Sequence, residues 1–212
     1  MAVLKIDIHS YWHAGSGRGR GAEADAVVMK TRSGLPYLPG RTIKGLVRES
    51  MRLAESSGVY PGLKGRTDEL FGQRDSVVDS EHDKGAGRFN VRSGALRFSD
   101  ARLGRTQEEH EKWESFASTN KGKELEANLF SILSSTAMDE KGLAKNKTLR
   151  SVEVAVPLTL YAFVEPVDGT DPAEWLNDLE KALPLLRALG SKRTRGFGRC
   201  TVTLLREMGV EG

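Results

Sequence analysis

The ten residues from Gly190 to Arg199, GSKRTRGFGR, are the part of this sequence best suited to binding an anion. They include four Lys or Arg residues, three glycines, one phenylalanine and no acidic residue. Glycines in a turn let backbone N–H groups approach a ligand closely, and clustered cations favour a negatively charged ligand. A polyphosphate chain such as RNA is the natural candidate, although a surface loop that is merely basic has the same composition.

A second cationic segment follows the proline-rich turn at 34–40. Apolar residues recur there at helical spacing, which predicts a helix that begins near Thr42 as its N-cap residue. The N–H groups and positive dipole end of a helix start attract phosphate. We therefore expect this segment to contact an RNA backbone, the alternative being a solvated helix face. The expected contacts are Arg41, Thr42, Lys44 and Arg48.

The net charge of +3 is small, but the charges are unevenly distributed. Residues 11–66 contain ten Lys or Arg against four Asp or Glu, whereas residues 67–140 contain ten against fifteen. Further cations cluster at 141–150 and 192–199. Such islands of positive charge can form a phosphate-binding track in a protein that is nearly neutral overall.

The composition excludes several other classes of protein. No apolar run is long enough to cross a bilayer, and the charged, alternating start predicts a strand and not a signal peptide. The single cysteine, Cys200, cannot form an internal disulfide, and no Cys/His cluster suggests zinc. We therefore expect a cytoplasmic protein with no membrane partner.

Periodicity predicts the elements that position these segments. Alternating apolar residues indicate strands at 3–8, 95–99 and 200–204, and one long strand at 152–164; helical spacing indicates helices at 42–54 and 171–190. The order β-α-β, then β-α-β, predicts an α+β fold with a ferredoxin-like (RRM-like) antiparallel sheet and helices on one face. Its core would comprise residues 1–57, 93–102 and 151–208.

The remaining residues form a large central insertion in this interpretation. Residues 58–92 are weakly patterned, and residues 103–133 are charged and partly helical. Residues 134–150 are rich in Ser, Lys and Gly, which suits a protruding hairpin.

Five segments, taken together, resemble a known group of proteins. Leu35–Arg48 carries a proline-glycine and lysine-glycine/arginine motif, and Arg195–Arg199 is a terminal glycine-rich loop. The others are His13–Gly17, Leu70–Gly72 with Leu96–Asp100, and Thr136–Ala144 with Leu149–Glu153. In this order they resemble motifs of the RAMP superfamily of CRISPR-associated proteins, and they cover nearly the whole chain. The chain is then a single RAMP domain, residues 1–212.

Within that superfamily the chain looks most like a backbone subunit of a type III effector complex. The resemblance implies that it binds guide RNA, that the guide pairs with target RNA, and that neighbouring subunits are other RAMP proteins or copies of itself. Residues 134–150 would be a thumb that kinks the guide, with Met138 or Leu143 as a wedge at its tip. The implied RNA contacts outside the first helix are Arg18, Arg20, Lys145, Lys147, Arg150, Lys192, Arg193, Arg195, Phe197 and Arg199. Phe197 would stack on a base or belong to the core.

The resemblance also implies a catalytic aspartate. Asp25 is the matching residue, lying shortly before the Gly34-Leu-Pro-Tyr motif at a spacing about one residue shorter than in the family. A lone carboxylate is a weak base at neutral pH, but it can anchor a divalent metal, here Mg²⁺, with Glu23 as a possible second ligand. The alternative is a solvated loop acid or an Asx-turn residue.

His13 is a second catalytic candidate, because imidazole titrates near neutral pH and suits acid–base chemistry. Metal-independent RAMP enzymes that process guide RNA use such a histidine, whereas a histidine that stacks on a base or caps the strand is the simpler interpretation. Three functions therefore stay open: target cleavage through Asp25, RNA binding without cleavage, and guide processing through His13.

Overall fold

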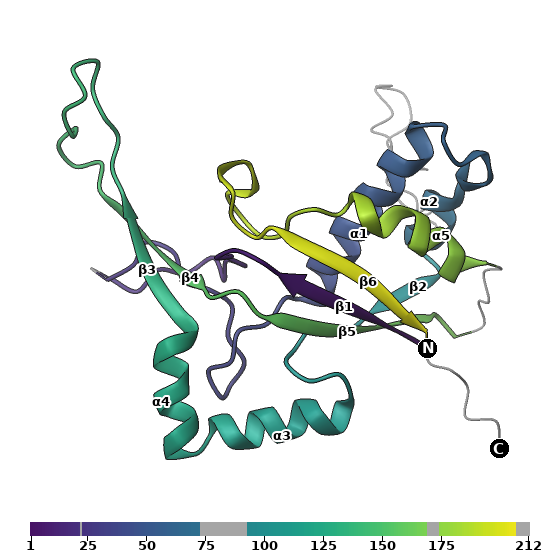
Figure 1. Cartoon of the computed structure of the whole chain (residues 1–212), viewed down its shortest axis with the longest axis horizontal. Coiled ribbons are helices and arrows are strands. Elements are labelled where there is room, and N and C mark those ends of the chain that lie inside the picture. Colours follow the sequence, from purple (N-terminus) through teal and green to yellow (C-terminus); the bar gives the residue numbers. More distant parts are fainter. Residues whose placement is uncertain (22, 73–92, 169–173, 207–212) are drawn as a thin grey trace, which may run out of the picture.

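The structure is a computed structural model that describes residues 1–21, 23–72, 93–168 and 174–206. Its centre is an antiparallel sheet in the order β2-β5-β1-β6 (Figure 1). The strands are β1 (Ala2–Ile8), β2 (Leu96–Phe98), β5 (Thr159–Pro166) and β6 (Cys200–Arg206). Helix α1 (Gly40–Ser56) follows β1, and α5 (Trp175–Ala182) lies between β5 and β6. The predicted α+β fold is confirmed, and the strand order is consistent with a ferredoxin-like core.

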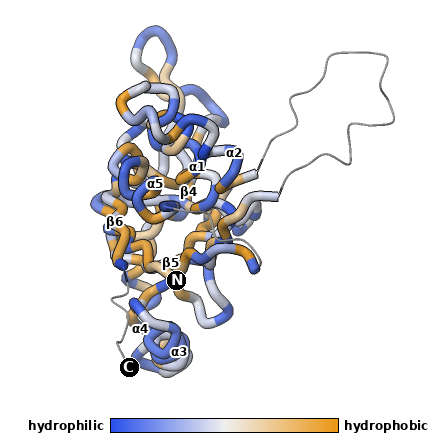
Figure 2. The backbone as a smooth tube through the Cα atoms, turned by 90° about the vertical axis from the view of Figure 1, so that its right-hand side faces the viewer, coloured by the Kyte–Doolittle hydropathy of each residue, from blue (hydrophilic) through white to orange (hydrophobic). Residues whose placement is uncertain are grey.

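The core lies between the sheet and helices α1 and α5. Alternate residues of β1 and β5, among them Leu4 and Leu160, are fully buried against this side. Helix α1 presents Ile43, Val47 and Met51, spaced four apart, to the same core. Figure 2 shows the hydrophobic residues gathered along the strands, with hydrophilic residues on α3 and α4. Burial of each large apolar side chain of this core contributes about 1.5–3 kcal/mol to the stability of the fold.

The opposite face of the sheet is partly covered by α3 (Gln107–Ala117), which lies in the charged segment 103–133. The His110 ring packs against Phe163 of β5 with centroids 5.4 Å apart, and its Nε2 donates to the Gly104 carbonyl at 2.8 Å. Burial lowers the pKa of His110. Helix α4 (Asn120–Leu129) follows, so the charged segment 103–133 is largely helical until β3 begins at Phe130.

A second, two-stranded sheet forms the base of a long hairpin, here called the thumb hairpin (residues 130–155). Strand β3 (Phe130–Ser135) pairs antiparallel with β4 (Arg150–Ala155), and the hairpin projects away from the central sheet (Figure 1). The single strand predicted at 152–164 is therefore wrong. Its alternation continues through residues 156–158, but β4 pairs within the thumb hairpin and β5 pairs within the central sheet. Alternation reports which face a side chain takes, not which strand is the partner.

The central insertion begins with a short 3₁₀ turn (Pro61–Leu63) and helix α2 (Arg66–Phe71). Leu63 and Leu70 join the main core, so this part of the insertion packs against α1. Residues 73–92, most of the predicted insertion, lie outside the described residues. Among the residues that the structure describes, no helix has the length and apolar character needed to cross a membrane.

Candidate nucleic-acid interface

Three segments that are distant in sequence meet at one groove. The first is the loop after β1, here called the early loop (residues 9–31); the others are the start of α1 and the Gly190–Arg199 segment, here called the basic loop. A pocket of about 440 Å³ lies between them. Its lining includes His13, Gly15, Arg41, Thr42, Gly190 and Arg193. The two cationic, glycine-bearing segments found in the sequence therefore share one groove.

Backbone hydrogen bonds hold the basic loop against the early loop, at a close approach that glycine allows. Gly190 has a φ of +75°, and a Cβ there would lie 2.5 Å from the His13 carbonyl oxygen. The next residue, Ser191, donates its N–H to that same oxygen at 2.9 Å, and Gly198 donates to the Tyr11 carbonyl at 2.8 Å. Only a residue without a side chain allows this approach. The loop that carries the cations is thus held in place by backbone contacts.

The cations of the basic loop lie on an exposed turn. Arg193 and Arg195 belong to a 3₁₀ turn and are exposed, and Arg193 Nη1 is 3.2 Å from the Glu49 carboxylate on α1. Phe197 is half-buried, with the Lys192 ammonium 5.9 Å above its ring centroid. In Figure 1 this loop lies between the thumb hairpin and helices α1 and α5. Arg199 is also exposed.

The start of α1 differs from the prediction. The helix begins at Gly40 and its N-cap residue is Pro39, three residues before the predicted N-cap residue, Thr42. The Asp100 carboxylate accepts the Gly40 N–H at 2.9 Å, and the Thr42 N–H bonds to the Pro39 carbonyl at 2.8 Å. An internal carboxylate therefore occupies the position where a phosphate was expected. Arg41 is exposed and lines the groove.

Lys44 and Arg48 make contacts within the protein. Lys44 Nζ donates to the Leu96 carbonyl of β2 at 2.8 Å, and burial, followed by the neighbouring Arg48 charge, lowers the pKa of Lys44. Arg48 Nη2 donates to the Gly72 carbonyl at 2.6 Å and lies 3.7 Å from Asp68. These bonds join α1 to β2 and to the end of α2. They favour a structural role for both side chains and leave Arg41 as the cation that α1 supplies to the groove.

Asp25 lies at the base of the thumb hairpin. Its N–H donates to the Ser151 carbonyl, and its Oδ2 accepts the Ser151 N–H, each at 2.7 Å. Both Asp25 and Glu23 are exposed, and Glu23 is 3.7 Å from Arg20 Nη1. Within the described ranges there is no group of three or more His, Cys, Asp or Glu side chains that could hold a metal ion.

His13 is almost fully buried at the wall of the groove. Its Nδ1 lies 2.7 Å from the Glu153 carbonyl oxygen. Because a carbonyl only accepts hydrogen bonds, Nδ1 carries a proton, which leaves Nε2 as the acceptor nitrogen in that tautomer. With 4% of the residue exposed, little of the ring is open to stack on a base.

The tip of the thumb hairpin presents apolar side chains among cations. Met138 and Leu143 are 68% and 64% exposed. The Asp139 carboxylate orders the tip by accepting the N–H groups of Lys141 and Leu143 at 2.9 and 2.8 Å. The other predicted thumb contacts are exposed: Lys145, Lys147 and Arg150. Arg18 and Arg20 are exposed on the early loop, beside the base of the hairpin.

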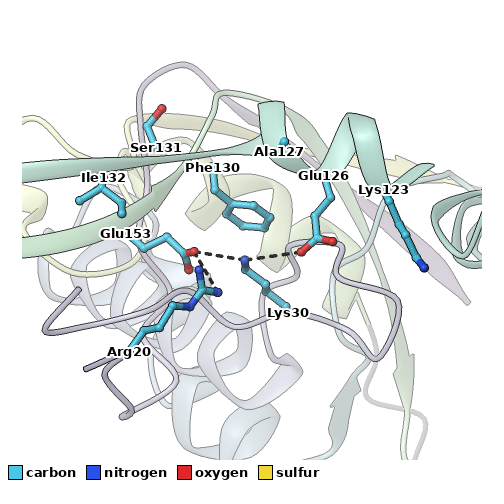
Figure 3. Close-up of a pocket in the computed structure, with 9 residues that line it drawn as sticks. All are labelled: Arg20, Lys30, Lys123, Glu126, Ala127, Phe130, Ser131, Ile132 and Glu153. Carbon is cyan, nitrogen blue, oxygen red and sulfur yellow. Dashed lines mark hydrogen bonds and ion pairs between the residues drawn. The ribbon is translucent and has the colours of Figure 1, made fainter. Parts of the chain in front are cut away.

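Sequence reasoning missed a polar cluster around a buried carboxylate at the base of the thumb hairpin, which Figure 3 shows. Its centre is the Glu153 carboxylate, which lies 3.1 Å from Lys30 Nζ. Glu153 is 4% exposed, although strand alternation places it on the polar face of β4. The alternation therefore gave no sign of its burial, because the early loop covers that face.

The whole fold resembles subunits of CRISPR complexes. Chains in two structures, titled "Type III-B Cmr-beta Cryo-EM structure of the Apo state" and "Cryo-EM structure of the Type III-B Cmr-beta bound to cognate target RNA", match with TM-scores of 0.67 and 0.61, each at 12% identity. The matches cover 97% and 96%, respectively, of both chains. A chain of a "Type IV-B CRISPR Complex" matches with a TM-score of 0.54 and 16% identity, over 100% of this chain and 92% of the other. At these identities the likeness shows a shared fold.

A search of curated proteins found no match to this sequence. The family model described as "RAMP superfamily" matches residues 5–201, which is most of the chain. That range includes the groove, the thumb hairpin and all five segments whose motifs suggested the resemblance. The chain belongs to the RAMP superfamily.

Proposed function

We propose that this chain is a guide-RNA-binding backbone subunit of a type III CRISPR ribonucleoprotein effector complex. The observation that carries this proposal is the groove where the start of α1, the early loop and the basic loop meet. The exposed cations Arg41 and Arg193 line it, and Arg195 and Arg199 are exposed on the same basic loop. The thumb hairpin projects beside it with an apolar tip, and the matched structures are subunits of complexes of this kind.

Contacts with phosphates position RNA without reading its sequence. Binding should therefore be indifferent to guide sequence and strongly dependent on salt. If about six phosphates are neutralised per subunit, the plot of log affinity against log salt concentration has a slope of roughly −4. A slope near zero would contradict the proposal.

The groove is tested by fluorescence anisotropy with two labelled single-stranded RNAs of unrelated sequence, over a range of KCl concentrations. Arg41→Ala and Arg195→Ala each remove one exposed cation and should weaken binding about five- to tenfold at 0.1 M salt. Arg97→Ala is the matched control, because Arg97 is a 56% exposed cation on β2 that pairs with Glu165. Equal affinities for all three variants would refute the groove as the binding site.

We further propose that Asp25 supports cleavage of paired target RNA with a divalent metal, most simply Mg²⁺. Mg²⁺ usually takes one or two carboxylates and completes its shell with water and phosphate oxygens, so a lone Asp25 fits a site that RNA completes. The metal would supply charge that favours attack of a ribose hydroxyl on the phosphodiester. The Ser151 N–H holds one Asp25 oxygen and thereby orients the carboxylate at the thumb base.

The cleavage proposal is tested with the assembled complex and end-labelled target RNA, in Mg²⁺ and in EDTA. Asp25→Asn keeps the size of the side chain and its bond to the Ser151 N–H, yet removes the charge. Periodic cuts that need Mg²⁺ and vanish in this variant support the proposal, whereas intact RNA with the unmodified chain favours a binding subunit without cleavage. Cuts in precursor guide RNA that persist in EDTA and vanish in His13→Ala favour guide processing, for which the acceptor Nε2 of His13 at the groove wall is suited.

A further inference from the structure

The polar cluster at the thumb base surrounds a buried carboxylate. A pocket of about 360 Å³ opens there between the early loop, α4 and the thumb hairpin (Figure 3). Within it, Glu153 Oε1 lies 3.1 Å from Lys30 Nζ and 3.6 Å from Arg20 Nη2. A buried charge is costly unless it is paired and hydrogen-bonded, so these partners are what allow Glu153 to be buried.

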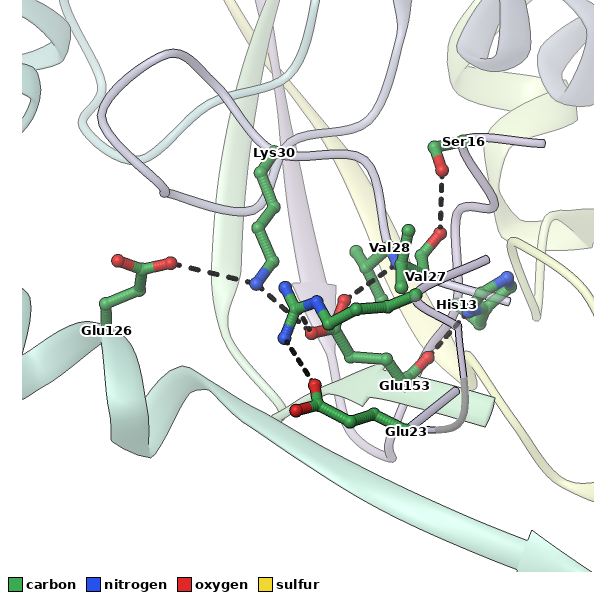
Figure 4. Close-up of polar contacts among 9 residues, drawn as sticks. His13, Ser16, Glu23, Val27, Val28, Lys30, Glu126 and Glu153 are labelled. Carbon is green, nitrogen blue, oxygen red and sulfur yellow. Dashed lines mark hydrogen bonds and ion pairs between the residues drawn. The ribbon is translucent and has the colours of Figure 1, made fainter. Parts of the chain in front are cut away.

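Glu153 also binds two backbone groups and the His13 side chain of the early loop, as Figure 4 shows in part. Its Oε2 accepts the Val28 N–H at 3.0 Å, its own N–H donates to the Ala26 carbonyl at 2.9 Å, and its carbonyl accepts from His13 Nδ1 at 2.7 Å. Through its main chain and its side chain, this one residue of β4 holds the early loop at positions 13, 20, 26, 28 and 30.

Lys30 extends the cluster to the rest of the thumb base. Its ammonium lies 3.7 Å from the centroid of the Phe130 ring, where β3 begins, and 3.7 Å from Glu126 Oε1 on α4. Removing the Glu153 charge would leave the Lys30 and Arg20 cations facing each other without the carboxylate between them. The loop segment that carries both catalytic candidates would then lose every contact that it makes with the Glu153 carboxylate and would keep only its backbone bonds and the Asp25 carboxylate bond to β4.

We propose that Glu153 is a positioning residue that fixes the early loop against the thumb hairpin, so that the loop cations and Asp25 meet RNA at a set place beside the thumb. Glu153 itself, nearly fully buried, does not touch the RNA. The part of this inference that concerns RNA rests on the proposed function, whereas the part that concerns the loop does not.

The loop is tested first in the free protein by hydrogen exchange. Glu153→Gln keeps the size of the side chain but places an amide group against two cations. Exchange at the Val28 and Asp25 amides should become roughly ten- to a hundredfold faster, because a charge-assisted bond holds the loop closed. Glu165→Gln, which removes the charge of a partly exposed, paired carboxylate on β5, is the control. Unchanged exchange in Glu153→Gln would overturn the proposal.

Lys30→Met is a second variant, which keeps an apolar side chain over Phe130 and removes the charge that pairs with Glu153. It should speed hydrogen exchange at the same two amides by a smaller factor. It serves in place of Glu153→Gln if that variant fails to fold. Protection of Val28 in Lys30→Met equal to that of the unmodified chain would also count against the cluster.

The effect on RNA is tested by a double-mutant cycle between Glu153 and Arg18. Arg18→Ala should weaken RNA binding about fivefold in the otherwise unmodified chain, and hardly at all when Glu153 is Gln, because the loop then no longer holds Arg18 in place. The same loss in both backgrounds would overturn the positioning role, even if Glu153→Gln lowers stability. If the unmodified chain binds no RNA, the proposed function fails, and hydrogen exchange still decides whether Glu153 holds the loop.

Discussion

Replacing Gly190 by alanine should separate the basic loop from the early loop. Gly190 has a φ of +75°, and an added Cβ would lie 2.5 Å from the His13 carbonyl oxygen and 3.1 Å from its carbonyl carbon. Both neighbours are backbone atoms, which cannot move aside as a flexible side chain can. Gly196, in the same loop, has a φ of +84° but no atom within 4 Å of its added Cβ. The two variants therefore share the backbone strain and differ in the clash.

The magnitude follows from these contacts. The left-handed conformation costs an alanine roughly 1–2 kcal/mol at either position. In Gly190→Ala the loop must also move away from His13, which breaks the 2.9 Å bond from the Ser191 N–H and loses about 1 kcal/mol or more. With the same strain of about 1.5 kcal/mol in both variants, we therefore expect about 2.5 kcal/mol of lost stability for Gly190→Ala and about 1.5 kcal/mol for Gly196→Ala.

The assay is urea unfolding of both variants and the unmodified chain in one buffer, followed by RNA binding of the folded proteins. A difference of about 1 kcal/mol between the variants corresponds to a midpoint difference of about 0.5 M urea. Gly190→Ala should also weaken RNA binding more than Gly196→Ala, because only the former displaces the cations from the groove. Equal midpoints and equal affinities would show that the basic loop is not locked to His13, and would refute the argument for a shared groove.

Three further predictions concern single residues. Measured by anisotropy, Arg41→Ala should make the salt slope of RNA binding shallower by about 0.7–0.9, because Arg41 lines the groove. Lys44→Met should leave that slope unchanged but lower stability in urea unfolding, because it removes the bond to the Leu96 carbonyl. Burial raises the pKa of the Cys200 thiol to about 12, so above pH 9 the unfolded chain loses a proton that the folded chain keeps. Stability should therefore fall as pH rises from 9 towards 12, and it should fall less in Cys200→Ala when unfolding is compared at pH 8 and 10. Leu143→Ser should leave the melting temperature unchanged, because Leu143 is 64% exposed, yet weaken guide binding or assembly measured by anisotropy and size-exclusion chromatography.

Much of the fold could be predicted because its signals are local. The strands at either end of the chain show plain alternation, and the buried stripe of α1 recurs at helical spacing. The five motifs also occurred in the order that the family requires. The division of residues 152–164 between two sheets could not be predicted, because the alternation passes unbroken through Val156 and Leu158.

The candidate site was predictable only in outline. The two cationic segments do meet, but a row of Lys and Arg on a helix looks the same in sequence whether it faces solvent or, like Lys44, reaches a backbone carbonyl of a neighbouring strand. Likewise, nothing near Gly40 in the sequence indicates that Asp100, sixty residues later, caps the helix. Glu153 was missed for the same reason, because its burial depends on a loop that is distant in the chain.

The thumb hairpin continues directly into the sheet, with only residues 156–158 between β4 and β5. Trp12 clamps this short connection, because its indole N–H donates to the Val156 carbonyl and its backbone pairs with Ala155. The base of the hairpin is thus fixed to the central sheet at this connection. A displacement of the hairpin would therefore act on β5, which pairs with β1 at the centre of the sheet. It would also act on His13, because His13 is bonded to Glu153 of β4.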